Sequence, residues 1–187
     1  MPLYDTAAGF NRELYEGGIK TSLEDCLFAV FDKSAVSGLE ESEKNYAGVV
    51  SLSHTDPVNA TTEIGIIVFP AFQRTHVGTN AIGLLLMWTL DPPSAGGLGL
   101  RRVEWQTHAE NTASRRTALR MGFEFEGVAR WQRTVLPGKP GVPVGKLEER
   151  NGTKEERLGR HTAIFSIVWD EWEEKRKGLV AQMARRR

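Results

Sequence analysis

An apolar run rich in β-branched residues is followed in this chain by a short polar turn and then by a longer apolar run. The first run, Glu-Ile-Gly-Ile-Ile-Val-Phe at 63–69, ends at Pro70, which is typical of a strand that stops at a turn. The second run predicts a buried helix because it is apolar on nearly all sides, through Ala81, Ile82, Leu84, Leu85, Leu86 and Trp88. A strand joined to a helix by a tight turn favours a fold that mixes the two element types.

The turn between these runs, residues 72–81, is predicted to bind phosphate. Thr79 and Asn80 are expected in the first turn of the helix. Several unpaired backbone N–H groups and the positive end of the helix dipole then meet at one point, where an anion binds well. The turn is therefore the first candidate for a ligand site.

Further elements are predicted on both sides of this unit. Residues 102–107 alternate like a strand, and the next helix opens at the capping residue Asn111 and stops before Gly122. Other strands are expected near 26–32, 46–54, 62–69, 123–135 and 161–169, and short helical pieces at 10–17 and 22–25. This order predicts a mixed α/β or α+β domain.

Two half-motifs in this order resemble those of the GNAT acyltransferases. The spacing Gln73-x-x-His76-x-Gly78 resembles the family signature Q/R-x-x-G-x-G/A. The second half resembles the RimJ/RimL-like branch, in the run Asn111-x-x-Ser114 followed by Leu119, Gly122-Phe123 and Glu126-Gly127. The resemblance covers residues 46–135 well. It implies a mostly antiparallel central sheet flanked by helices, with a V-shaped splay between the fourth and fifth strands.

The resemblance implies an acetyl-CoA-dependent N-acetyltransferase. Such an enzyme moves an acetyl group to a primary amine of a small molecule or a protein N-terminus by direct attack in a ternary complex. The alternative is a non-catalytic acyl-CoA-binding or regulatory protein of the same fold, which is motivated by His76 in place of the family's first glycine. His76 is either an exposed turn residue or a ring beside the phosphate. The identity of the amine does not follow from the fold.

The resemblance also assigns coenzyme A to the strand and the turn. Pantetheine amides are expected to pair with the main chain of Ile66, Ile67 and Val68, where the strand splays from its neighbour. The diphosphate is expected on backbone N–H groups of the turn, with side-chain contacts from Gln73 and Arg74. The full set of turn residues is Gln73, Arg74, Thr75, His76, Val77, Gly78, Thr79 and Asn80.

Three residues are candidates for the chemistry of acyl transfer. Glu63 stands where RimJ/RimL-like enzymes often carry a base, and half burial of its carboxylate would raise its pKa toward neutrality. Glu63 is alternatively a strand residue whose side chain faces solvent and has no catalytic role. Ser114 matches the serine expected near the sulfur, and Asn111 is expected near pantetheine or the acceptor. Both also fit a structural role at the start of a helix. His108 is a weaker candidate than Glu63 for proton transfer. The tryptophans at 105, 131, 169 and 172 are expected to pack in the core.

Two departures from the family are expected. No strand and long helix are found ahead of Tyr4, so the chain looks shortened at its N-terminus, and another chain or the first few residues should cover the sheet edge. A homodimer is one such arrangement. The second departure is a long loop at 136–160, interpreted as an acceptor-side lid. Residues 170–187 are expected to form a C-terminal helix and a basic tail.

Composition agrees with one domain over 1–187 and excludes several classes of partner. Twenty-four basic and 24 acidic residues cancel, so no overall field recruits nucleic acid or a membrane. Cys26 is the only cysteine, which excludes an internal disulfide, and its apolar run predicts a buried thiol. The absence of a secretory signal favours a cytoplasmic protein, and no metal is expected.

Overall fold

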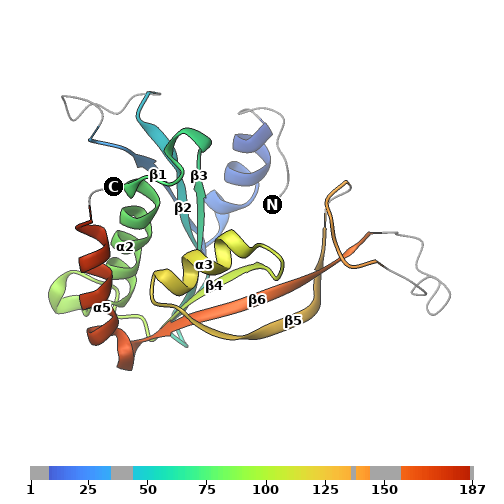
Figure 1. Cartoon of the computed structure of the whole chain (residues 1–187). Helices are drawn as coiled ribbons and strands as arrows, with labels where there is room; N and C mark the ends of the chain where they lie inside the picture. The colour runs from blue at the N-terminus through green and yellow to red at the C-terminus, as the bar shows by residue number, and fades with distance from the viewer. Residues whose placement is uncertain (1–8, 35–43, 136–137, 144–156, 186–187) are drawn as a thin grey trace.

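The computed structural model describes residues 9–34, 44–135, 138–143 and 157–185. It contains six strands: β1 (Cys26–Phe31), β2 (Tyr46–Asp56), β3 (Thr61–Val68), β4 (Arg102–His108), β5 (Glu124–Thr134) and β6 (Gly159–Val168). The α-helices are α2 (His76–Leu90), α3 (Thr112–Arg120) and α5 (Trp169–Met183), and four short helical turns are η1 (Phe10–Glu16), η2 (Ile19–Thr21), η3 (Pro70–Phe72) and η4 (Pro93–Ala95). Figure 1 shows α2 and α5 side by side.

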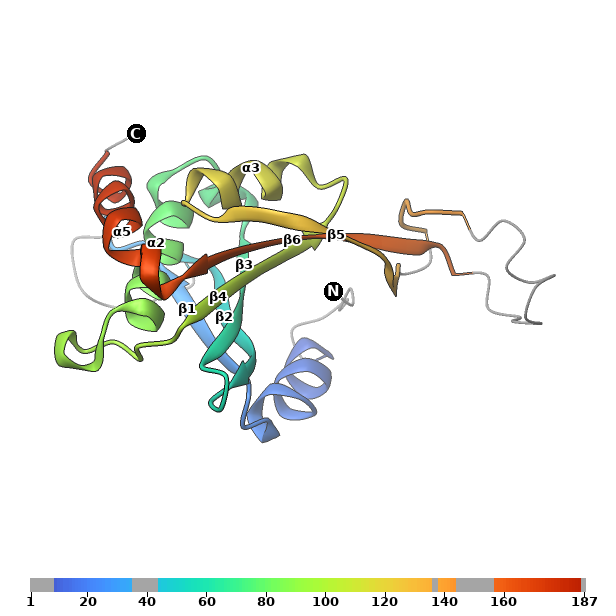
Figure 2. The same cartoon turned by 90° about the horizontal axis from the view of Figure 1, so that it is seen from below.

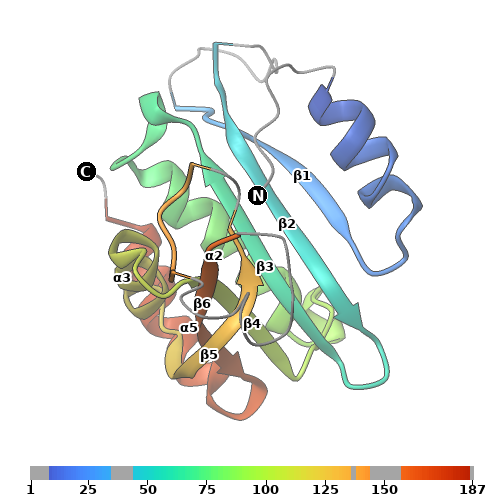
Figure 3. The ribbon, with the colours of Figure 1, turned by 90° about the vertical axis from the view of Figure 1, so that its right-hand side faces the viewer.

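The strands form one sheet in the order β1-β2-β3-β4-β6-β5. Every neighbouring pair is antiparallel except β3 and β4, which are parallel and pair only from Thr61 opposite Arg102 to Glu63 opposite Glu104. Beyond Glu63 the two strands diverge, and Figure 3 shows β3 running away from β4. This confirms the predicted mixed, mostly antiparallel sheet flanked by helices. Counted along the described residues, the splay lies between the third and fourth strands, one place earlier than the expected fourth and fifth.

The core fills the space between the sheet and the helices α2 and α5. Its largest fully buried side chains include Ile82 and Leu86 of α2, Phe165 and Ile167 of β6, and Phe123 before β5. The helix α2 contacts β2, β3 and β4, so it packs on both sides of the splay. Figures 1 and 3 show η1 on the other face of the sheet, near β1 and β2.

A buried ionic contact ties α5 to the end of α2. Asp91 accepts a hydrogen bond from the Trp172 indole at 2.7 Å, and Arg176 donates to both of its carboxylate oxygens, at 2.8 and 2.9 Å. The carboxylate is 9 % exposed. Burial alone would raise the pKa of Asp91, but these hydrogen bonds outweigh it and hold the pKa below 3.8.

Several predictions of burial are wrong. Cys26 is exposed, because β1 is an edge strand of the sheet and presents part of its apolar sequence to solvent. In α2, Leu84 is 62 % and Trp88 37 % exposed, since only part of this helix faces the sheet. Trp105 and Trp172 are in the core as expected, whereas Trp131 and Trp169 are exposed.

Two element boundaries on either side of the site differ from the predictions. The second short helical piece lies at Ile19–Thr21 rather than 22–25. The strand β6 starts at Gly159, so it takes in the end of the predicted 136–160 loop, and Figure 2 shows β5 and β6 extending together away from the rest of the sheet. Most of that loop, at 136–137 and 144–156, lies outside the described residues, as do 186–187 of the basic tail.

Candidate active site

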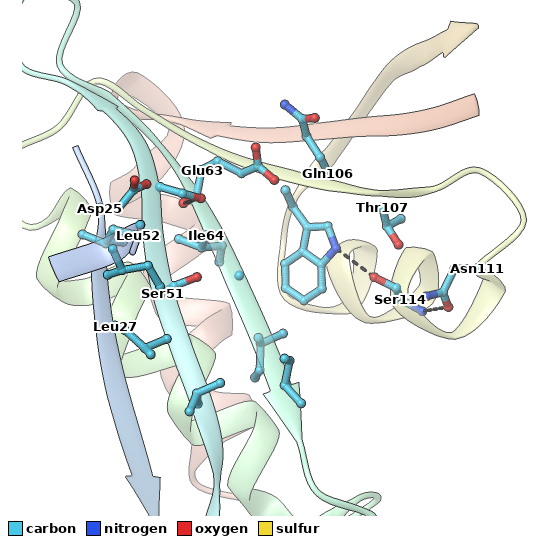
Figure 4. Close-up of a pocket in the computed structure, with 18 of the residues that line it drawn as sticks. Asp25, Leu27, Ser51, Leu52, Glu63, Ile64, Gln106, Thr107, Asn111 and Ser114 are labelled. Carbon is cyan, nitrogen blue, oxygen red and sulfur yellow. Dashed lines mark hydrogen bonds between the residues drawn. The ribbon is translucent and has the colours of Figure 1, made fainter. Parts of the chain in front are cut away.

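A cleft of about 590 Å³ opens where β3 and β4 diverge. Figure 4 shows Ser51, Leu52 and Ile64 on one side of it, and Gln106, Thr107 and Ser114 on the other. Glu63, the last residue of β3 that pairs with β4, stands at the point of divergence. The cleft therefore exists because the two strands share only three residue pairs.

Glu63 lies in this cleft with a carboxylate that is 18 % exposed. Burial raises its pKa above the ordinary 4.5, and the nearby His54, Arg133 and Arg160 only partly oppose this effect. His54 Nδ1 lies 3.5 Å from Glu63 Oε2, on a ring that is 68 % exposed. Glu63 is therefore a largely buried carboxylate with a raised proton affinity.

Ser114 faces the same cleft from the first turn of α3. Its Oγ accepts a hydrogen bond of 2.9 Å from the indole N–H of Trp105, a side chain that is 4 % exposed and packs edge-on against Phe123. Because the indole occupies one lone pair of Oγ, the hydroxyl proton is directed away from Trp105. Asn111 is the N-cap of α3, and its Oδ1 accepts from the Ser114 backbone N–H at 3.1 Å.

The turn after β3 forms the predicted helix N-terminus, but the helix begins at His76 rather than near Thr79. Thr75 is the N-cap, and its hydroxyl accepts from the Val77 N–H at 3.3 Å. By helix geometry the N–H groups of His76 and Gly78 stay outside the intrahelical bonds, while those of Thr79 and Asn80 lie within them. The positive φ of the turn, 63°, falls on Arg74. A side chain at His76 therefore costs no backbone strain, because the residue is helical.

The side chains of the turn are partly held by the protein. Gln73 donates to the Val68 carbonyl at 3.0 Å, and His76 Nε2 lies 3.5 Å from Asp32 Oδ1. The ring of His76 is 32 % exposed, so it is half-buried against a carboxylate. Thr75, His76, Thr79, Asn80 and Arg120 line a hollow of about 240 Å³ at the helix start, in which Asn80 Oδ1 is buried with no hydrogen-bond partner in the described chain.

Comparison with known proteins points to one family. The model of the acetyltransferase (GNAT) domain matches residues 7–124. A GCN5-related N-acetyltransferase from Brucella melitensis shares 31 % sequence identity, with a TM-score of 0.70, over 96 % of this chain and 66 % of the other. This chain belongs to the GNAT acetyltransferase family. The resemblance of the two half-motifs is thereby confirmed at the level of the family.

Other solved structures share the GNAT fold. A probable GNAT-family acetyltransferase from Chromobacterium violaceum is 25 % identical, with a TM-score of 0.66, over 92 % of this chain and 70 % of the other. A variant of the spermidine N-acetyltransferase SpeG from Vibrio cholerae is 16 % identical, with a TM-score of 0.57, over 87 % and 73 %. No curated protein matches the sequence. The chain spans slightly less than two thirds of the Brucella structure's length.

The residues of this GNAT domain fit coenzyme A in two respects. The edge of β3 that faces the splay has no partner strand beyond Glu63 among the described strands, so main-chain groups of Ile64–Val68 are open to a ligand. At the helix start, a Cβ on Gly78 would meet only Val68 within 4 Å, so the protein itself leaves room there.

The structure brings Glu63, Ser114 and Asn111 to one cleft, whereas the turn follows the end of β3 and four of its residues, Thr75, His76, Thr79 and Asn80, line a separate hollow. Sequence reasoning missed four participants: Trp105, which was assigned to packing alone, and Asp25, Arg133 and Arg160 in the cleft wall. Only the alternation in 102–107 hints at Trp105, as an inward position. Within the described ranges no group of three or more His, Cys, Asp or Glu could hold a metal, and no helix is long and apolar enough to cross a membrane.

Proposed function

We propose that this GNAT domain is an acetyl-CoA-dependent N-acetyltransferase of the RimJ/RimL-like branch, acting on a primary amine. The observation that supports this best is the pairing of two groups in one cleft: a buried carboxylate with a raised pKa and a hydroxyl whose proton is directed away from its indole donor. Amine acylation needs a proton acceptor and a proton donor at opposite ends of the reacting atoms.

The chain offers two sets of groups to hold acetyl-CoA. The open edge of β3, at Ile66, Ile67 and Val68, would pair with amide groups of the pantetheine arm in the manner of an added strand. The free N–H groups of His76 and Gly78, with side chains of Thr79 and Asn80, would receive the diphosphate at the positive end of α2. Gln73, Arg74, Thr75 and Val77 complete that turn. When bound, the cofactor supplies an acetyl group activated as a thioester.

Glu63 would act as the base. The incoming amine is protonated in water, and nitrogen attacks only with its lone pair free. Glu63 takes the proton from nitrogen, directly or through a water molecule, as the C–N bond forms and the C–S bond breaks. A carboxylate held out of water is a stronger base than an exposed one, which is the effect of the burial of Glu63.

Ser114 would act at the sulfur. Its hydroxyl would donate a hydrogen bond that stabilises the departing thiolate, which would then take its proton from water. Trp105 is a positioning residue in this scheme, because its indole N–H occupies one lone pair of Oγ and limits the directions in which the hydroxyl proton can point. Asn111 holds the start of α3 and so places Ser114 at the cleft.

The test is release of free CoA from acetyl-CoA, followed with a thiol reagent, in the presence of a panel of primary amines. Release that depends on an amine, and that falls at least 100-fold in Glu63→Gln, supports the enzyme. Glu173→Gln, an exposed change on α5, is the matched control. CoA that binds in calorimetry without any release would favour the alternative, a non-catalytic acyl-CoA-binding or regulatory protein.

We also propose that the outer edge of β1 pairs with a second copy of the chain. No described strand lies on that side of β1, and an unpaired strand edge tends to pair with another chain. Light scattering that reports a dimer, and a monomer when a proline replaces Ala29 in β1, would support this arrangement. A monomeric parent protein would refute it.

A further inference from the structure

Two arginines from neighbouring strands line the cleft that holds Glu63. Arg133 on β5 is the register partner of Arg160 on β6, so the two side chains leave directly opposite positions of neighbouring strands. Like charges placed opposite each other across strands destabilise a sheet. Arg133 is exposed and Arg160 half-buried, so solvent screens part of this repulsion and an anion between them would relieve the rest.

Among the described residues neither arginine forms a close ion pair, and Glu63 in the same cleft interacts with both only at longer range. Arg102 and Arg176 each have a carboxylate, at 2.6 and 2.8 Å, whereas no described carboxylate forms an ion pair with Arg133 or Arg160. The Nε of Arg160 is buried and has no hydrogen-bond partner. Burial, together with the charge of Arg133, lowers the pKa of Arg160 below its ordinary value, and the charge of Glu63 only partly opposes this effect.

Both guanidinium groups border two adjoining cavities. They line the 590 Å³ cleft that holds Glu63 and also a second hollow of about 690 Å³, to which Lys139 adds a third cation. Glu63 and Asp25 supply carboxylates to the first cleft, and Glu63 also shares a smaller hollow with Arg133. A ligand in the first cleft therefore meets both carboxylates and guanidinium groups, and among the described residues that line the second hollow the three cations outnumber the one carboxylate, Glu110.

We propose that the acceptor is a small amine that also carries a carboxylate or phosphate group, bound between Arg133 and Arg160 with its amino group at Glu63. This inference rests on the proposed acetyltransferase function and adds the class of its substrate. Arginine suits the role because its planar N–H groups match the oxygens of carboxylate and phosphate. A polyamine such as spermidine would instead bring a second ammonium group against two guanidinium groups, which is unfavourable.

The bulge in β5 explains how the pair is formed. The register of β5 on β6 shifts between Ala129 and Arg133, and within this stretch Trp131 adopts a positive φ of 56° and donates its N–H to His161 Nδ1 at 2.9 Å. The shift brings Arg133 opposite Arg160. A bulge re-aims side chains next to a site, and here it sets the spacing of the two cations.

The test compares three series of amines with the same chain lengths: ω-aminoalkanoates or ω-aminoalkyl phosphates, the corresponding ω-amino amides, and diamines. The measured quantity is kcat/KM for release of CoA. We expect the anionic series to exceed the amides at least tenfold at the best length, and the diamines to be the poorest. Comparing kcat/KM for the aminoalkanoates with that for the aminoalkyl phosphates shows which of the two anionic groups the site prefers. Equal rates for anionic and neutral amines, or a preference for diamines, would overturn the inference while leaving the acetyltransferase intact.

Variants test the two arginines directly. Arg133→Gln and Arg160→Gln should each raise KM for the anionic acceptor about tenfold or more, with kcat changed much less, and should leave KM for the neutral amide unchanged. Arg130→Gln, the same change at an exposed position of the same strand, is the control. A purely structural role of the arginines would move KM for both acceptors alike, and this result would refute the inference.

Calorimetry separates failure of this inference from failure of the proposed function. The same ω-aminoalkanoates and phosphates are titrated into the protein with CoA present, where no turnover is needed. Binding that is lost in Arg160→Gln and kept in Arg130→Gln supports the anion site even if no amine is acetylated. Absence of binding by every anionic amine refutes the site, whatever the catalytic result.

Discussion

The hydrogen bond between Trp105 and Ser114 separates a catalytic from a structural role for the serine. Replacing Ser114 with alanine leaves the indole N–H without its acceptor on a side chain that is 4 % exposed. An unsatisfied buried donor costs about 1–3 kcal/mol. The higher helix propensity of alanine returns about 0.5 kcal/mol. We therefore expect a net loss of about 0.5–2.5 kcal/mol, or about 1–10 °C in Tm for a chain of this size.

The effect on turnover is independent of this loss of stability. A hydrogen bond to a charged group contributes about 1.5–3 kcal/mol, so losing the bond to the thiolate should lower kcat about 10- to 150-fold. Trp105→Phe keeps the hydroxyl but no longer limits its orientation, and should lower kcat about threefold to tenfold. The control is Thr117→Ala, which removes a hydroxyl on the same helix that bonds only the Ala113 carbonyl.

The assay is a double-mutant cycle in kcat and in the free energy of unfolding by urea. If Trp105 acts through Ser114, then Trp105→Phe has no further effect on kcat in the Ser114→Ala background. A kcat within twofold of the parent in Ser114→Ala, despite the lower Tm, would exclude the serine as the hydrogen-bond donor to the thiolate. A full effect of Trp105→Phe in both backgrounds would show that the indole acts by another route.

Three further predictions concern other parts of the domain. In the parent, kcat/KM should rise with pH on the acidic side as Glu63 ionises, with a pKa raised above the ordinary 4.5. Glu63→Gln should remove this rise. If the rise persists in the variant, another group is responsible for it. Asp91→Asn should lower the free energy of unfolding in urea by about 2–3 kcal/mol, a figure reduced from that of a fully buried ion pair because Arg176 is 39 % exposed. Because the pKa of Asp91 is lowered in the folded state, the stability that Asp91 contributes should be fully present above pH 3.8 and should be lost as the pH falls through the folded-state pKa. Gly159→Ala should displace the Trp131 ring, because the new Cβ would overlap it; the displaced ring would move Arg133 on the same strand and raise KM for the acceptor. The control is Gly178→Ala, which has open space around it and should leave KM unchanged and alter stability only by the difference in helix propensity.

The strand, turn and helix around residues 63–90 could be predicted because their signals are local. Pro70 marks the end of β3, and the apolar run identifies α2. The start of α2 was misplaced because His76 and Thr75 are polar and resemble turn residues, although Thr75 is a normal cap. Asn111 and Gly122 marked the ends of α3 correctly for the same local reason.

The contacts that complete the candidate site depend on distant parts of the chain. The pairing of Arg133 with Arg160 follows from a bulge whose position has no clear sequence signal, and 26 residues separate the two in the chain. The bond from Trp105 to Ser114 joins a strand to the next helix, so periodicity identified the tryptophan as buried but gave no partner. The exposure of Cys26 depends on the place of β1 at the sheet edge, which its own residues do not encode.

The three residue pairs between β3 and β4 also have a mechanical consequence. They are the only ladder that joins a half-sheet of β1, β2 and β3 to a half-sheet of β4, β6 and β5 among the described strands, with α2 packed across both. A ligand that pairs with the rest of β3 and contacts β4 would connect the two half-sheets. At a free ligand concentration of 100 times its Kd, it would add about 2.7 kcal/mol to the free energy of unfolding. Amide hydrogens of Ile64–Val68 would then exchange more slowly with solvent, so the cofactor would stabilise the folded sheet as well as take part in the reaction.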